Sequence, residues 1–405
     1  MKPDKDVLCP LPFVHPFFDV RGYYSACCNG SYFENSKHVS EMSAEEWFYS
    51  KDMEQLRNDM LDGTRNPMCD HCWKKDDISI WSPRKTHIEH WKNKDVDYAN
   101  PKPRYFDLKP SNHCNLACLF CTASSSDKII KITESLPINE RPNRWQNALN
   151  YVKSNMSKGT FDPNVVEYIK NNINDLELLK FTGGEPFLSK EVLEILTMIS
   201  EIKPNVEIKI TTNGTVITKD FYPILKKLKN TSIKFSIDAV EDLYSYIRFP
   251  SKWNQFQSRI ENNMANLPQV NFNVNCLITN MNLEQMPKII KWYKDLESKY
   301  SNLKFIILDP NMHPNNNESS LYMMDPKVLK RIKDKLEQIN WDTNCKTESQ
   351  MTKVVFKKID DCIKNSLYKE HIIKSEFEKH NKIRKIKVQE VVEPITKEFF
   401  EGLLI

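Results

Sequence analysis

Between Arg104 and Asp309, short segments that alternate apolar and polar residues are followed by longer segments with apolar residues at helical spacing. The alternation predicts strands, and the longer spacing predicts helices that follow them. The predicted strands cover 104–109, 177–182, 206–211, 233–238, 270–278 and 303–309, and the predicted helices cover 188–202, 218–229, 251–266 and 283–298. Strands that alternate with helices in this way favour a parallel sheet.

The polar positions of these strands distinguish between two kinds of parallel sheet. Strands covered by helices on both faces would be almost continuously apolar. Here Lys234-Phe235-Ser236-Ile237-Asp238 alternates instead. A curved sheet with one apolar face and one polar, inward face explains this pattern. We therefore predict an α/β fold, a partial (β/α)6 TIM-like barrel with its active site at the carboxyl ends of the strands.

The two flanking segments have different patterns. Residues 1–100 contain five cysteines and are predicted to form a cysteine-rich module; Ser43 and Glu46 form a capping box that opens a helix running to about Gly63. Residues 101–314 form the predicted barrel, and 315–405 form a helical, highly charged C-terminal extension. The basic stretch at 380–387 is expected to be a solvated helix face.

Composition limits the possible environments. The chain has 405 residues, 40% of them hydrophobic, and a net charge of +4, which indicates a soluble protein with no membrane partner and makes nucleic acid an unlikely one. No apolar run approaches the roughly 20 residues of a membrane span. The first residues contain no apolar signal segment, so we expect a cytoplasmic location. In a reducing compartment, 11 cysteines are expected to be metal ligands rather than disulfides.

Three cysteines follow the first predicted strand at the spacing C-x3-C-x2-C: Cys114, Cys118 and Cys121. Three thiolates on one loop can hold three irons of a 4Fe–4S cluster and leave the fourth iron without a protein ligand. A zinc site, or thiols without a metal, is the alternative. Structural zinc normally takes four ligands, often as C-x2-C pairs, which this loop lacks.

The cysteine string resembles the signature of the radical SAM superfamily, including an aromatic residue, Phe120, before the last cysteine. The resemblance implies a 4Fe–4S cluster that binds S-adenosylmethionine (SAM) at its open iron. It also implies reductive cleavage of SAM to a 5′-deoxyadenosyl radical, which abstracts hydrogen from a substrate. In the family, the residue at the position of Phe120 contacts the adenine.

Later strand ends carry further motifs that are similar to those of this superfamily. The string after the second strand resembles its GGEP motif, which binds the methionine amino group; adjacent glycines let the backbone approach a ligand, and a carboxylate suits an ammonium. The strings after the third and fourth strands resemble its ribose and carboxylate contacts. An arginine further on matches one that binds the SAM carboxylate, with a surface ion pair as its alternative role. The SAM contacts implied are Gly183, Gly184, Glu185, Pro186, Thr212, Asn213, Gly214, Ser236, Asp238 and Arg248.

The N-terminal cysteines resemble the opening of a twitch/SPASM module, which holds an auxiliary cluster. The similarity rests on Cys9 and Cys27 around Gly22, followed by the pair Cys69 and Cys72. It implies a second 4Fe–4S cluster with these four cysteines as ligands. The module departs from the usual pattern, because it precedes the barrel and lacks the remaining SPASM cysteines. The neighbouring Cys28 could replace Cys27 as a ligand, and a four-cysteine zinc site is the alternative.

These features favour a radical SAM enzyme that receives electrons from a flavodoxin- or ferredoxin-type reductant. Its favoured substrate is a peptide or protein, and the alternative is dehydrogenation or rearrangement of a small molecule. A non-catalytic iron–sulfur protein for electron transfer or redox sensing is a third possibility. The intact GGEP string argues against that class, since electron transfer needs no SAM pocket. The residues that exchange protons with the substrate are not identified by the sequence.

Overall fold

The computed structural model describes residues 7–19, 22–30, 36–77, 82–155, 164–310, 318–341 and 346–404. Within them, parallel strands alternate with helices, which confirms the predicted α/β fold of the partial-barrel type. The chain folds as two compact units. The first comprises residues 1–112, 152–210 and 227–230, and the second comprises 113–151, 211–226 and 231–405. In the described part of the chain, no helix is both long and apolar enough to cross a membrane.

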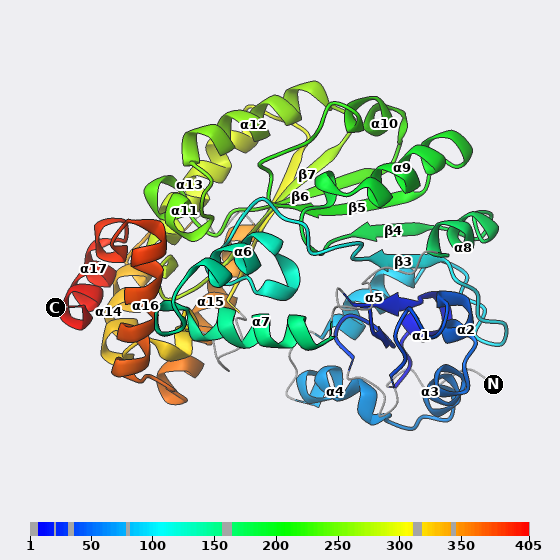
Figure 1. The fold of residues 1–405 in the computed structure, drawn as a ribbon, viewed down its shortest axis with the longest axis horizontal. Helices are drawn as coiled ribbons and strands as arrows, with labels where there is room; N and C mark the ends of the chain where they lie inside the picture. The colour runs from blue at the N-terminus through cyan, green and yellow to red at the C-terminus, as the bar shows by residue number, and fades with distance from the viewer. Residues whose placement is uncertain are drawn as a thin grey trace. The chain divides into compact units, whose positions relative to one another are not determined.

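The first unit contains the N-terminal module and the first strands of the predicted barrel. Its helices α1 and α3 pack together, as do α2 and α8 (Figure 1). Its elements are α1 (Leu11–Val14), β1 (Phe17–Phe18), β2 (Tyr24–Ser25), α2 (Ala44–Phe48), α3 (Lys51–Leu61), η1 (Pro67–Cys69), α4 (Asp70–Asp77), α5 (Pro83–Trp91), β3 (Tyr105–Leu108), α8 (Val165–Asn171), β4 (Leu178–Phe181), η5 (Pro186–Leu188), α9 (Lys190–Ile202) and β5 (Glu207–Thr212), the last of which ends in the second unit.

The strands of the first unit are ordered β2-β1-β3-β4-β5. β1 pairs antiparallel with β2, and the pairs β1–β3, β3–β4 and β4–β5 are parallel. The two-residue strands β1 and β2 were not predicted, because so short a segment shows no alternation. In register, Asp107 lies beside Lys180, and Lys180 lies beside Lys209.

The capping box of the N-terminal module is present, since Ser43 accepts from the Glu46 backbone and the Glu46 side chain accepts from the Ser43 backbone. The prediction of one helix to about Gly63 is wrong. The first helix ends at Phe48, and Ser50 caps a second helix, α3, by accepting a hydrogen bond from the Met53 backbone. A serine that satisfies the first amide groups of a new helix stabilises a break at this point.

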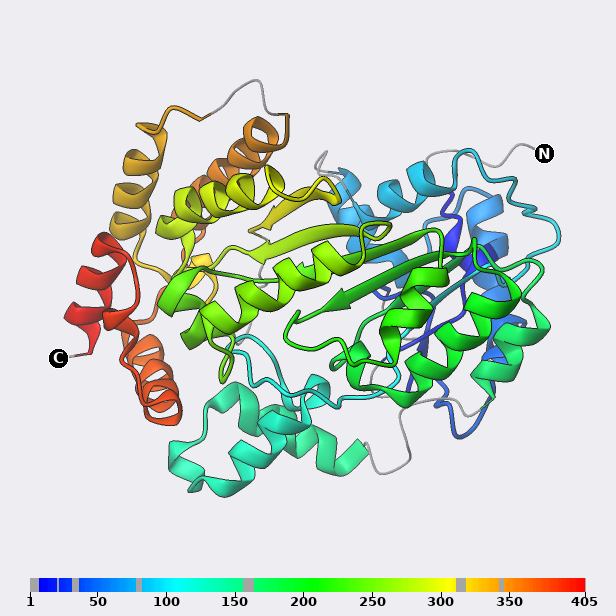
Figure 2. The same ribbon diagram turned by 90° about the horizontal axis from the view of Figure 1, so that it is seen from above.

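The second unit contains strands β6, β7 and β8, in that order and parallel, with α13 alongside β8 (Figure 2). The helical C-terminal extension is observed, with α17 packed on α14 and α16. Its elements are η2 (Ala123–Ser125), α6 (Asp127–Ser135), η3 (Ile138–Glu140), α7 (Asn143–Asn155), α10 (Phe221–Lys227), β6 (Thr231–Ser236), α11 (Glu241–Ile247), α12 (Trp253–Asn266), β7 (Asn271–Leu277), η6 (Leu283–Gln285), α13 (Met286–Glu297), β8 (Leu303–Asp309), η7 (Leu321–Met323), α14 (Pro326–Glu337), α15 (Lys346–Lys364), α16 (Glu370–Arg384), η8 (Val388–Glu390) and α17 (Pro394–Leu403).

Burial follows the predicted alternation in β5 and β6, where buried residues alternate with half-buried ones. In β3 every residue is buried, including Asp107, which is 1% exposed. The prediction that 380–387 is a solvated face is only partly right. Lys382, Lys385 and Lys387 are exposed, but Arg384 is 3% exposed, because its guanidinium finds backbone and aromatic partners inside the second unit.

Candidate functional site

The loop that carries Cys114, Cys118 and Cys121 is fixed by backbone hydrogen bonds within the second unit. Ala117 N donates to Phe249 O at 2.7 Å, and Leu119 N donates to Ile247 O at 2.9 Å. At its start, Cys114 N donates to an Asp127 carboxylate oxygen at 2.9 Å. The thiols of Cys114 and Cys118 are buried with Leu116, and Cys121 packs against them. The three predicted ligands therefore pack against one another, although their side chains are not among any group of described residues arranged to hold a metal ion.

Two of the three sulfurs receive hydrogen bonds from predicted SAM-site residues. Asn213 Nδ2 donates to Cys114 Sγ at 3.7 Å, and Arg248 Nη1 donates to Cys118 Sγ at 3.7 Å. Asn213 Nδ2 also donates to Asn115 Oδ1 at 2.9 Å. Donors aimed at cysteine sulfurs suit thiolates, and such contacts tune iron–sulfur clusters. The donor set therefore fits a 4Fe–4S cluster on this loop.

Burial dominates the electrostatics of this loop. It raises the pKa of Cys121 to about 11, and it raises the pKa of Cys118 against the opposing charge of Arg248. Arg248 forms an ion pair with Asp238, and the two side chains are 12% and 2% exposed. The alternative of a surface ion pair for Arg248 is therefore wrong. Burial disfavours its charge, but the Asp238 carboxylate outweighs burial and raises the pKa of Arg248.

The remaining predicted SAM contacts of the second unit lie near these residues in sequence and differ in burial. Thr212 accepts from the Gly214 backbone at 3.0 Å in a tight turn. Gly214 has φ +72, and a Cβ there would lie 2.8 Å from the Phe256 ring. Phe120 and Ser236 are half-buried, whereas Asp238 is buried at a positive φ of 61. The string after the second strand lies in the first unit.

The Thr182–Pro186 string forms a tight turn after β4. Gly183 has φ +107, and a Cβ there would lie 3.1 Å from Ser111 O. The next amide, Gly184 N, donates to that same Ser111 carbonyl at 3.0 Å. Glu185 is 2% exposed and caps η5 by accepting from Phe187 N at 3.2 Å, with Pro186 at the first helical position. Both glycines thus lie at a close backbone approach.

The four N-terminal cysteines line one cavity in the first unit, together with Arg84 and His87. Burial raises the pKa of Cys9, Cys27 and Cys72, and it raises the pKa of Cys69 to about 12. The negative charge of at least one other cysteine of the set raises the pKa of Cys9, Cys27 and Cys69 further. The four thiols are therefore mutual neighbours.

Cys28 differs from this set, since it is exposed, accepts a hydrogen bond from Asn29 at 3.2 Å and does not line the cavity. Gly22, at φ +84, lies where a Cβ would be 2.6 Å from His38 Nε2, so a side chain would not fit. Among the residues that the structure describes, no three His, Cys, Asp or Glu side chains are grouped so as to hold a metal ion.

An ion pair between the neighbouring strands β3 and β4 was not predicted from the sequence. Lys180 Nζ on β4 donates to Asp107 Oδ2 on β3 at 2.7 Å. Asp107 Oδ1 is buried without a hydrogen-bond partner among the described residues. Burial opposes ionisation of Asp107, but the neighbouring lysine outweighs burial and lowers the pKa of this carboxyl. The sequence contained only part of this signal, two charged residues at strand positions, because the register that places them side by side is set by the pairing of β3 with β4.

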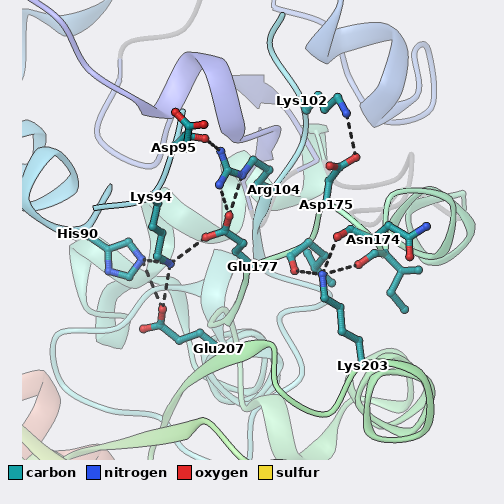
Figure 3. Close-up of polar contacts among 12 residues, drawn as sticks. His90, Lys94, Asp95, Lys102, Arg104, Asn174, Asp175, Glu177, Lys203 and Glu207 are labelled. Atoms are coloured by element: carbon teal, nitrogen blue, oxygen red, sulfur yellow. Dashed lines mark hydrogen bonds and ion pairs between the residues drawn. The ribbon is translucent and has the colours of Figure 1, made fainter. Parts of the chain in front are cut away.

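A charged cleft of 410 Å³ lies at the other, N-terminal ends of β3 and β4 (Figure 3). Arg104 pairs with Glu177, Lys94 lies 3.3 Å from Glu177, and Lys203 Nζ donates to three backbone carbonyls at 2.8–3.0 Å. Within the cleft, Arg104 is paired with Glu177 and Lys102 with Asp175. In barrels of this kind, this end of the strands contributes to stability, while chemistry occurs at the carboxyl ends. We therefore assign a structural role to the cleft.

Comparison with known protein families agrees with the resemblance that the cysteine loop shows to the radical SAM superfamily. Residues 108–296 match the family model of the radical SAM superfamily. Over this range the chain is similar to a radical SAM domain. This match supports an enzyme of the radical SAM superfamily, a family that uses a 4Fe–4S cluster and SAM as cofactors. The matched range includes all three loop cysteines and every predicted SAM contact.

Curated proteins are also similar to this chain. A GTP 3′,8-cyclase of Campylobacter jejuni subsp. doylei is 27% identical over 150 residues, 36% of this chain and 38% of that protein. The molybdenum cofactor biosynthesis protein moc-5 of Caenorhabditis elegans is 22% identical over 253 residues, 59% of this chain and 38% of that protein. The chain therefore spans 38% of the length of either relative.

Solved structures are also similar to this chain. Native anSMEcpe with bound AdoMet and a Cp18Cys peptide matches with a TM-score of 0.38 and 22% identity, over 57% of this chain and 58% of that one. Streptococcus suis SuiB matches with a TM-score of 0.36 and 15% identity, over 83% of this chain and 68% of that one.

Proposed function

We propose that this protein reductively cleaves SAM at a 4Fe–4S cluster held by Cys114, Cys118 and Cys121, and abstracts hydrogen from a bound substrate. When bound, the cluster supplies the electron that converts SAM to methionine and a 5′-deoxyadenosyl radical. The observation that carries the proposal is the pair of hydrogen bonds to the loop sulfurs from Asn213 and Arg248. A zinc site or a set of unconnected thiols would not require donors from two later motifs.

The other predicted SAM contacts take roles that suit their geometry. Glu185 is proposed to receive the methionine ammonium, because a buried carboxylate is a strong acceptor for a charged donor. Gly183 and Gly184 allow the tight turn against Ser111 that carries Glu185, and they are proposed as backbone contacts of SAM. Arg248 is fixed by Asp238 at the cysteine loop and is proposed to contact the SAM carboxylate. Further proposed contacts are Phe120 to the adenine and Pro186, Thr212, Gly214 and Ser236 to the rest of the cofactor.

The N-terminal module is proposed to hold an auxiliary 4Fe–4S cluster, in the manner of a twitch/SPASM module. The support is the shared cavity lined by Cys9, Cys27, Cys69 and Cys72, residues that are up to 63 positions apart in the chain. The exposure of Cys28 favours Cys27 as the ligand. An additional cluster in this place would bind the substrate or accept an electron from the product radical.

The proposed substrate is either a peptide or protein or a small molecule. Peptide or protein modification, the branch favoured by the sequence, has no support beyond that resemblance. The names of the curated relatives, GTP 3′,8-cyclase and a molybdenum cofactor biosynthesis protein, favour a small molecule. We therefore propose a small organic substrate. A flavodoxin- or ferredoxin-type reductant and a cytoplasmic location complete the proposal.

The test is anaerobic reconstitution of the full chain with iron and sulfide, followed by reduction in the presence of SAM. We expect methionine and 5′-deoxyadenosine in equal amounts. The variant Cys118→Ala should lose the activity, because it removes one of three ligands of the cluster that delivers the electron. Cys276→Ala is the matched control, since Cys276 is a buried cysteine of β7 outside the loop. Equal SAM cleavage by wild type and Cys118→Ala would refute the proposal.

A further inference from the structure

Arg384, at the end of α16, is a buried cation in the C-terminal extension. Each of the three nitrogens of its guanidinium forms a hydrogen bond. Nε donates to Tyr246 O at 2.7 Å, and Nη2 donates to Ala117 O at 3.3 Å. Ala117 directly precedes Cys118 in the proposed cluster loop. A residue 267 positions away in sequence is therefore hydrogen-bonded to the loop backbone itself.

The surroundings of Arg384 are aromatic rather than acidic. Its guanidinium carbon lies 5.7 Å from the Trp145 ring centroid, 5.2 Å from that of Tyr246 and 5.7 Å from that of Phe249. Aromatic faces attract a cation, and more strongly where water is excluded. They do not neutralise its charge, as a carboxylate would. Arg384 thus places a net positive charge beside the backbone of the cysteine loop, at the Ala117 carbonyl.

A histidine and a glutamate hold the guanidinium in this orientation. Arg384 Nη1 lies 2.9 Å from His380 Nδ1, and His380 Nε2 lies 3.2 Å from Glu318 Oε1. Arginine can only donate, so Nδ1 must accept and Nε2 must carry the proton that it donates to Glu318. His380 is fully buried and Glu318 is 4% exposed. The histidine is therefore neutral, and the carboxylate contacts Arg384 only through it.

The two arginines beside Cys118 differ in charge balance. Arg248 donates to Cys118 Sγ but is neutralised by its direct ion pair with Asp238. Arg384 donates to the preceding carbonyl and has no direct carboxylate contact among the hydrogen bonds and ion pairs of the described residues. Burying a charge is costly unless it is compensated. Thiolates and the sulfides of a cluster on this loop would supply that compensation.

We infer that Arg384 is a positioning residue that fixes the Cys114–Cys121 loop and, through its charge, makes the cluster on that loop easier to reduce. The inference rests on the proposed function, since it requires a cluster on the loop. Nearby charge and hydrogen bonding are among the features by which a protein sets the reduction potential of an iron–sulfur cluster. The C-terminal extension would then act in the first step, the delivery of an electron to SAM.

The test is a redox titration of the reconstituted full chain, monitored by the electron paramagnetic resonance signal of the reduced cluster. Iron content is measured in parallel. Arg384→Gln removes the charge, and because its amide nitrogen reaches only as far as Nε, it keeps a donor for the Tyr246 carbonyl but not for that of Ala117. Arg384→Lys keeps the charge. Lys382→Gln removes one charge from an exposed position of the same helix. To keep the two clusters apart, every variant is made in a Cys69→Ala, Cys72→Ala background as well.

We expect the ratio of reduced to oxidised cluster at a fixed potential to fall about tenfold in Arg384→Gln, or about 59 mV for a one-electron couple. Arg384→Lys and Lys382→Gln should titrate as wild type. Iron lost from Arg384→Gln but retained by Arg384→Lys would also support the inference, as charge then holds the cluster. A wild-type titration for Arg384→Gln, or equal changes in all three variants, would overturn it. If the wild type bound no iron, the proposed function itself would fail.

Discussion

Replacing Gly214 by alanine tests whether the turn after β5 is built as the structure describes. Gly214 has φ +72, a conformation that costs a residue with a Cβ roughly 1–2 kcal/mol. The added Cβ would also lie 2.8 Å from Phe256 Cε2 and 3.0 Å from Phe235 Cδ1, two buried rings of the second unit. Overpacking of this kind costs about 1–3 kcal/mol. Together we expect a loss of about 2–5 kcal/mol in the free energy of unfolding.

The assay is urea unfolding monitored by circular dichroism, with Gly402→Ala as the matched control. A Cβ at Gly402, in α17, would have no heavy atom within 4 Å. In a helix, alanine is favoured over glycine by up to about 1 kcal/mol, so this variant should be unchanged or more stable. The neighbouring Asn213 donates to Cys114 Sγ, so Gly214→Ala should also take up less iron. A Gly214→Ala midpoint equal to that of the wild type would refute the reasoning.

Two further predictions concern the first unit. Replacing Cys69 and Cys72 together by Ala should remove about four of about eight irons in the reconstituted chain, while SAM cleavage without substrate persists; metal analysis showing about four irons and one zinc in the wild type would contradict the auxiliary cluster. Burial lowers the pKa of His15 from 6.5 to about 4. As pH falls, the unfolded chain therefore binds a proton at His15 at a higher pH than the folded protein does. Stability should therefore decline from pH 6.5 towards 4 by up to about 1.4 kcal/mol per pH unit, and His15→Gln should flatten this decline in urea midpoints; an unchanged slope would refute it.

The sequence by itself determined the order of strands and helices from 104 to 309 and the identity of the cysteine loop. Period-2 alternation is a local property, and each strand of the predicted set was found within two residues of its expected limits. The cysteine spacing is local as well, because three proposed ligands on one loop need no distant residue to be recognised. The glycines at 183 and 214 were recognisable for the same reason, since each serves a turn of a few residues.

Only the tertiary structure decided which distant residues meet. β1 and β2 are two residues each, too short for a pattern, and exist because β1 pairs with β3. The ion pair of Asp107 with Lys180 depends on the register of neighbouring strands. Arg384 looked like one more cation of a solvated helix, because helical periodicity cannot tell which cation will meet a carbonyl 267 residues away. Burial turned that cation from a surface charge into a contact of the cysteine loop, and burial is a property of the folded chain rather than of any segment.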